Sequence, residues 1–99
     1  MVGDVEIHLS IHQVLVEGTV IALPRKQFQL LTLIAQAGGA VCTRERIMVE
    51  VWQNYAPGQE PELDEFVLQI QSALKRPWII ETVYDVGYRL GRPPAKPQR

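Results

Sequence analysis

Cysteine is almost missing from this chain of 99 residues, in which Cys42 is the only one. An intrachain disulfide is therefore impossible, and the fold must depend on its apolar core. A single cysteine fits a reducing compartment, and we expect a cytoplasmic location. Thiol catalysis would need a base near Cys42, but His8 and His12 fall in a different expected element. We therefore interpret Cys42 as a small buried apolar residue.

Long apolar runs are also lacking, whereas a helix that crosses a bilayer needs about 20 apolar residues. The N-terminus does not show the basic and then apolar pattern of a secretion signal. We accordingly expect no membrane contact by this segment. No third ligand accompanies His8 and His12 at a useful spacing, and there is no phosphate-binding loop and no pairing of a nucleophile with a base. The sequence thus predicts no metal site, no cofactor and no enzyme.

The chain also lacks an excess of basic residues. It has ten Lys and Arg and eleven Asp and Glu, for a formal net charge of −1. A strongly basic domain would be the usual sign of nucleic-acid binding. The bases gather near the C-terminus, with four of them in residues 84–99 and none in residues 1–23. Length and composition suit one domain with one core, which we place at residues 1–92. Residues 93–99, rich in proline and basic residues, are expected to form a disordered tail.

Short β-rich runs and turn residues predict sheet at both ends of the chain. Three runs near the N-terminus predict an antiparallel sheet, at residues 4–9, 14–16 and 20–23. Near the C-terminus, β-rich residues 78–83 and 88–90 flank a possible turn and predict a hairpin. The fold class is therefore α+β.

Three helices are expected between these sheets, and the first two have clear end signals. Pro24 suits the start of a helix over residues 25–36, which Gly38 and Gly39 should end. Thr43 is a plausible N-cap for a second helix from residue 44 to about 53. Residues 54–60 have the composition of a loop.

Residues 61–76 form the most clearly amphipathic stretch, with Pro61 at its expected start. Its apolar residues fall on one face of a helix and should be buried: Leu63, Phe66, Val67, Ile70 and Leu74. The opposite face carries Glu62, Glu65, Leu68, Gln69, Gln71, Ser72, Lys75 and Arg76. Any function of this helix must be exercised through that second face.

This order of elements, together with several short motifs, resembles the OmpR/PhoB family of winged-helix DNA-binding domains. The resemblance covers residues 4–92, and its most specific parts are Val51-Trp52, Thr82-Val83 and the run Val86-Gly87-Tyr88-Arg89-Leu90. It implies a winged helix-turn-helix with an N-terminal antiparallel sheet, three helices and a C-terminal hairpin wing. It also implies a bacterial transcription regulator of a two-component phosphorelay. In this family the third helix lies in the major groove and the wing reaches the minor groove.

The resemblance assigns duplex DNA as the partner and suggests which side chains touch it. Gln69, Gln71 and Ser72 could bond base edges, since glutamine pairs well with adenine. Cations expected at phosphates or in the minor groove are Lys75, Arg76, Arg89, Arg92, Arg44 and Arg46. A homodimer on DNA would be compatible with this arrangement. The alternative for each of these cations is that it only solvates the surface.

The third helix departs from the family pattern in its charge, since residues 60–76 hold four acids and two bases. Such a helix neutralises fewer phosphates. A second interpretation therefore stays open, in which a degenerate winged helix is a protein–protein interaction module. It would pair with itself, with another regulator or with RNA polymerase. Leu68 and Tyr84 could serve such contacts, as could the loop residues Tyr55 and Gln59, because the family contacts polymerase through this loop.

Overall fold

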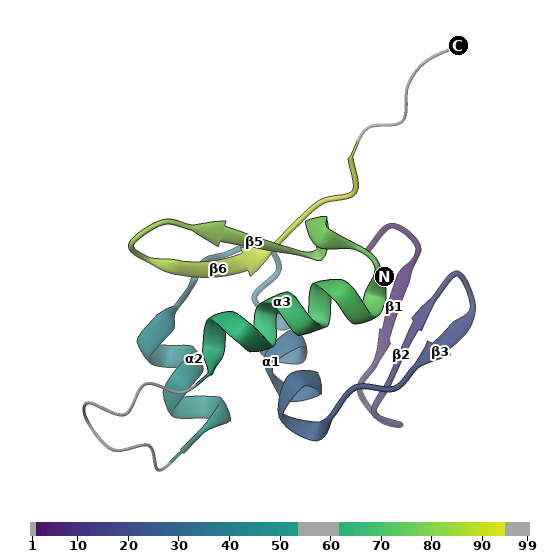
Figure 1. Ribbon diagram of the computed structural model, residues 1–99, viewed down its shortest axis with the longest axis horizontal. Helices are drawn as coiled ribbons and strands as arrows, with labels where there is room; N and C mark the ends of the chain where they lie inside the picture. Colours follow the sequence, from purple (N-terminus) through teal and green to yellow (C-terminus); the bar gives the residue numbers. More distant parts are fainter. Residues whose placement is uncertain (1, 54–61, 95–99) are drawn as a thin grey trace.

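The computed structural model describes residues 2–53 and 62–94 (Figure 1). Tyr55, Gln59 and Pro61, like residues 95–99 of the expected tail, lie outside the described residues. The elements follow one another in the order β1 (Val5–His8), β2 (Gln13–Val16), β3 (Thr19–Ile21), α1 (Arg25–Gln36), β4 (Cys42–Thr43), α2 (Arg44–Val51), α3 (Leu63–Leu74), η1 (Pro77–Ile79), β5 (Ile80–Val83) and β6 (Gly87–Leu90). The prediction of an α+β winged helix-turn-helix is confirmed.

The N-terminal sheet is an antiparallel meander in the order β1-β2-β3, as predicted. Its β2–β3 turn contains Glu17 and Gly18, which both have positive φ, at 51° and 81°. A two-residue turn of this kind matches the twist of the strands that it joins. The third strand begins and ends earlier than expected, since β3 stops at Ile21. Val5, Val14 and Val16 are buried and connect this sheet to the core.

The first two helices begin where their sequence signals predict. α1 starts directly after Pro24, and its buried face includes Leu30, Leu31 and Ile34. α2 is capped by Thr43, whose side-chain oxygen accepts a hydrogen bond from the Arg46 backbone N–H at 3.1 Å. Both helices pack against each other beneath the hairpin.

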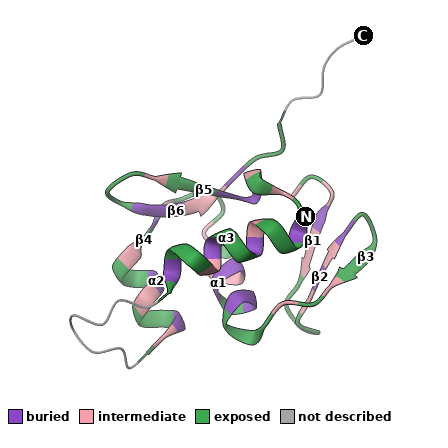
Figure 2. Ribbon diagram, in the orientation of Figure 1, coloured by how far each residue is buried: buried purple, intermediate pink, exposed green. Residues whose placement is uncertain are grey.

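α3 crosses α1 and presents a buried and an exposed side, which alternate along the helix in Figure 2. Leu63, Val67, Ile70 and Leu74 are buried as predicted. Phe66 is only half-buried, because it lies at the edge of the apolar stripe and packs on Trp52, with ring centroids 5.0 Å apart. No helix among the described residues is long and apolar enough to cross a membrane.

The C-terminal hairpin is part of a three-stranded sheet in the order β4-β6-β5. The sequence did not predict β4, since two residues are too few to show an alternating pattern. The prediction of a strand over residues 78–83 is wrong at its start, because Pro77–Ile79 forms the 3₁₀ turn η1. The Ile79 N–H bonds the Arg76 carbonyl at 3.0 Å, so this segment turns before β5 begins.

Gly87 is required by the close pairing of β4 with β6, where it lies opposite Thr43. A Cβ at this position would lie 1.9 Å from the Cys42 carbonyl oxygen. We expect Gly87→Ala to lower the free energy of unfolding by about 3 kcal/mol or more, measured by urea denaturation. Gly38→Ala is the matched control, because its Cβ would meet nothing within 4 Å. Its left-handed φ limits the expected loss to about 1–2 kcal/mol, so equal losses would contradict the steric explanation.

Candidate functional site

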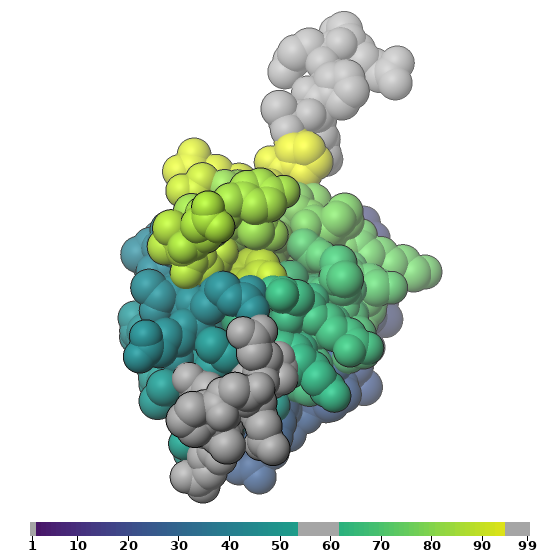
Figure 3. Space-filling view, turned by 60° about the vertical axis from the view of Figure 1, so that its left-hand side comes forward, coloured from purple at the N-terminus to yellow at the C-terminus, as the bar shows by residue number. Residues whose placement is uncertain are grey.

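The exposed side of α3 and the C-terminal hairpin form neighbouring parts of one surface. α3 begins below the hairpin tip and ends beside the N-terminal sheet (Figure 1). In the space-filling view the yellow-green hairpin adjoins both the teal surface of α2 and the green surface of α3 (Figure 3). Of the described residues that the sequence assigned to DNA, Gln69, Gln71 and Ser72 lie on α3, Lys75 and Arg76 follow it, and Arg89 lies on β6 with Arg92 just after it; Arg44 and Arg46 lie on α2.

Asp64 connects three elements at the start of this surface. Its Oδ1 accepts hydrogen bonds from Arg44 Nη1 of α2, at 2.5 Å, and from the Tyr88 hydroxyl of β6. These bonds, first the one from Arg44 and then the one from Tyr88, hold the pKa of Asp64 below its ordinary value. Burial, together with the bond to the Asp64 carboxylate, raises the pKa of Tyr88 to about 12. Asp64 therefore fixes the start of α3 relative to the wing, a role that its sequence position alone did not reveal.

Gln71 connects α3 to the beginning of the hairpin. Its Nε2 donates to the backbone oxygens of Pro77, at 2.9 Å, and Ile80, at 3.0 Å. Both amide hydrogens are thus used inside the protein, although the sequence assigned this side chain to a base edge. Gln69 is more exposed, yet its Oε1 accepts a bond from Gln27 of α1 at 2.5 Å.

Arg76 lies where α3 has ended and contacts the N-terminal sheet region. Its Nη2 lies 2.5 Å from Asp4 Oδ2 and 3.4 Å from Glu17 Oε2. The hydrogen bond to Asp4 is the main cause of the raised pKa of Arg76. The end of α3 is thereby joined to the N-terminal sheet region. A DNA contact by Arg76 would have to compete with its bonds to Asp4 and Glu17.

The remaining expected cations differ in how far they are paired. Arg46 Nε lies 3.1 Å from Glu50 Oε2 on α2, and Arg89 Nε donates to Glu81 Oε1 at 2.9 Å across the hairpin. The side chains of Lys75 and Arg92 make no hydrogen bond or ion pair with residues 2–53 and 62–94. The sequence placed these cations near one surface but did not identify their internal acidic partners. Two of these partners left a usable signal. Glu50 follows Arg46 by four residues on the expected second helix, and Glu81 stands opposite Arg89 in the register of β5 and β6.

Comparison with known proteins identifies the family. The family model described as "Transcriptional regulatory protein, C terminal" matches residues 18–90, about three quarters of the chain. The chain belongs to this family. The resemblance to OmpR/PhoB-type domains is thereby confirmed, and with it the prediction that the domain is not an enzyme.

This transcriptional regulatory domain is similar to part of two longer proteins and to one separate DNA-binding domain. The DNA-binding response regulator MtrA of Mycolicibacterium smegmatis is 30% identical over 96 residues, which cover 93% of this chain and 42% of MtrA. The OmpR/PhoB homolog DrrB of Thermotoga maritima has a TM-score of 0.78 at 31% identity, covering 90% of this chain and 42% of DrrB. The Klebsiella pneumoniae RstA DNA-binding domain shares the fold, with a TM-score of 0.80 at 22% identity, covering 92% and 94% of the two chains. The chain spans less than half of MtrA and DrrB.

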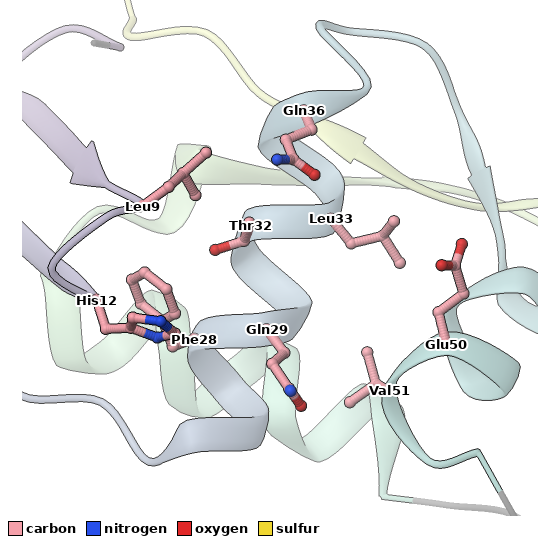
Figure 4. Close-up of a pocket in the computed structure, with 9 residues that line it drawn as sticks. All are labelled: Leu9, His12, Phe28, Gln29, Thr32, Leu33, Gln36, Glu50 and Val51. Atoms are coloured by element: carbon pink, nitrogen blue, oxygen red, sulfur yellow. The ribbon is translucent and has the colours of Figure 1, made fainter.

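This transcriptional regulatory domain has a hollow between the β1–β2 turn, α1 and α2, and no residue of α3 lines it (Figure 4). The rings of His12 and Phe28 lie at one end of it, with centroids 5.2 Å apart, and Glu50 and Val51 of α2 lie at the other. None of the residues that the sequence assigned to DNA lines this hollow.

The Asp64 contacts predict a stability difference that depends on pH. Asp64→Asn removes the charge that bonds Arg44, and the pair is partly exposed. We therefore expect a loss of about 1 kcal/mol in unfolding free energy at neutral pH. Because the folded pKa of Asp64 is lowered, this stabilisation is complete above the unfolded pKa of about 3.9 and is lost as the pH falls through the folded value.

Urea denaturation of both proteins from neutral pH down to about pH 2 measures this difference. It should shrink toward zero at the acid end. Asp85→Asn is the control, since Asp85 makes no side-chain hydrogen bond or ion pair with the described part of the chain. A difference for Asp64→Asn that stays constant over the whole range would show that its charge is not what stabilises the fold.

Proposed function

We propose that this domain is the output domain of a transcription regulator and binds duplex DNA. α3 would lie in the major groove and the β5–β6 wing at the neighbouring minor groove. The observation that carries the proposal is the position of the exposed side of α3 next to a projecting hairpin on one surface. MtrA, by its name a DNA-binding response regulator, and RstA, solved with the RstA box, support this ligand class.

The distribution of charge sets how this domain would hold DNA. α3 has no Lys or Arg from Leu63 to Leu74, and its first turn holds Asp64 and Glu65. Phosphate contacts would therefore come first from Lys75 and Arg92. Arg44, Arg46 and Arg89 would add the guanidinium N–H groups that do not bond their acidic partners. An arginine that keeps its carboxylate partner adds hydrogen bonds but little net charge.

The other expected contacts divide into those that face DNA and those that support the surface. We assign base contact to Ser72 and to the exposed part of Gln69. Gln71 and Arg76 would have to break internal bonds to reach DNA, so we assign them to holding the wing and the N-terminal sheet against α3. The same proposal includes a cytoplasmic location and a homodimer on DNA. It also includes contact with RNA polymerase or another regulator through the loop that contains Tyr55 and Gln59.

Titration of a random-sequence duplex, followed by fluorescence anisotropy, tests the proposal. If about three phosphates are neutralised, affinity should fall about 40-fold between about 50 and 200 mM salt. A strongly basic winged helix would lose far more over this range. Absence of binding at tens of micromolar protein in the lower salt would contradict the proposal.

Glu81 offers a sharper test, because it occupies part of the Arg89 guanidinium. Glu81→Gln should release Arg89 for a phosphate, which tightens binding and steepens the plot of log affinity against log salt by about 0.9. Glu6→Gln is the matched control, since it removes the same charge from the N-terminal sheet, where Glu6 contacts His8. An equal gain in both variants would show a general charge effect and not release of Arg89.

The second candidate function is a protein–protein interaction module, and exposed apolar residues favour it. Leu68, Tyr84 and Val86 are 65%, 86% and 44% exposed. An apolar side chain that projects from a polar face is typical of interface cores. Sedimentation of the same protein discriminates the two functions. A concentration-dependent dimer combined with no DNA binding would favour this candidate.

A further inference from the structure

Leu68 lies in the middle of α3, on the side of the helix that is exposed. It follows Asp64 by four residues and precedes Gln71 by three, so the three side chains are neighbours on the helix surface. Both of these neighbours bond the hairpin, Asp64 through the Tyr88 hydroxyl and Gln71 through the Ile80 carbonyl. Leu68 therefore lies above the junction between α3 and the wing, with 65% of its surface exposed.

The polar side chains around Leu68 are largely occupied by contacts within the protein. Asp64 is bonded to Arg44 and Tyr88, and Gln71 uses its amide hydrogens on the backbone of Pro77 and Ile80. Gln69 accepts a bond from Gln27 and approaches Glu65 at 3.4 Å. On this face the Ser72 hydroxyl makes no hydrogen bond to the described residues, and Leu68 has no polar side-chain atom.

We propose that Leu68 reads the 5-methyl group of thymine in the major groove, so that the domain selects duplexes with thymine opposite the middle of α3. This inference rests on the proposed DNA binding. In the major groove only thymine presents a methyl group, and an apolar side chain distinguishes it by direct contact. Specific recognition of guanine by a bidentate arginine is not available from α3, which contains no arginine.

Burial also favours this contact over simple exposure of Leu68 to water. A leucine placed against a base edge without a methyl group would cover polar atoms and leave them unpaired, which is unfavourable. Against thymine it covers an apolar group instead. One buried methyl group contributes about 0.8 kcal/mol, which corresponds to about fourfold in affinity.

Replacing thymine by deoxyuridine tests the inference, because the two bases differ only by this methyl group and pair alike. A duplex that binds the protein is first selected from a random-sequence library. Each thymine is then replaced singly by deoxyuridine, and the affinity is measured by anisotropy. The original protein should lose about fourfold at one position and little elsewhere.

Leu68→Ala should bind the thymine and deoxyuridine duplexes equally. Alanine is a strong helix former and Leu68 is exposed, so this variant should keep the fold. Val20→Ala is the matched control, since it shortens an exposed apolar residue of β3 in the N-terminal sheet and should keep the fourfold preference.

Three results would overturn the inference in distinguishable ways. Binding without any thymine preference would overturn the methyl contact and leave DNA binding intact. A preference that persists in Leu68→Ala would assign the contact to another residue. Failure to select any bound duplex would overturn the proposed function together with this inference.

Discussion

Burial of one side of α3 determines which residues of this helix can reach a partner. Leu63, Val67, Ile70 and Leu74 are fixed against the core, so the remaining positions of the helix must face outward or toward the wing. An apolar stripe fixes rotation about the helix axis but not the angle to a neighbouring element. Polar bonds supply that second constraint, from Asp64 at the start of the helix and from Gln71 near its end.

Acidic residues that pair with the arginines lower the positive charge of this surface. Arg44, Arg46, Arg76 and Arg89 each have an acidic partner within the protein. A ligand phosphate that meets a paired arginine gains a directed hydrogen bond, but it gains less from release of counterions. Binding by such a surface depends more on shape and on individual base contacts than on attraction to the DNA backbone. Weak attraction to random sequence is the natural result.

The sequence predicted what depends on neighbours along the chain and missed what depends on neighbours in space. The Thr43 cap, the rotation of α3 and the hairpin follow from short-range spacing and were correct. Strand β4 exists only because β6 lies beside it, and no pattern of two residues can show this. For the candidate site, the sequence indicated the outward face of α3. It could not show that Gln71 is used internally, because only the unpredicted turn η1 brings its two acceptors, Pro77 and Ile80, next to each other.

The contact between Arg76 and Asp4 joins the end of α3 to a part of the chain 72 residues away in sequence. It joins the end of α3 to the N-terminal sheet region through a charged pair. A ligand that competes for Asp4 would leave Arg76 with more of its charge available near the end of α3. Since thermodynamic linkage is reciprocal, a phosphate that draws Arg76 away would loosen the sheet by the same free energy. Any ligand that displaced this pair at the end of α3 would therefore also change the stability of the sheet region.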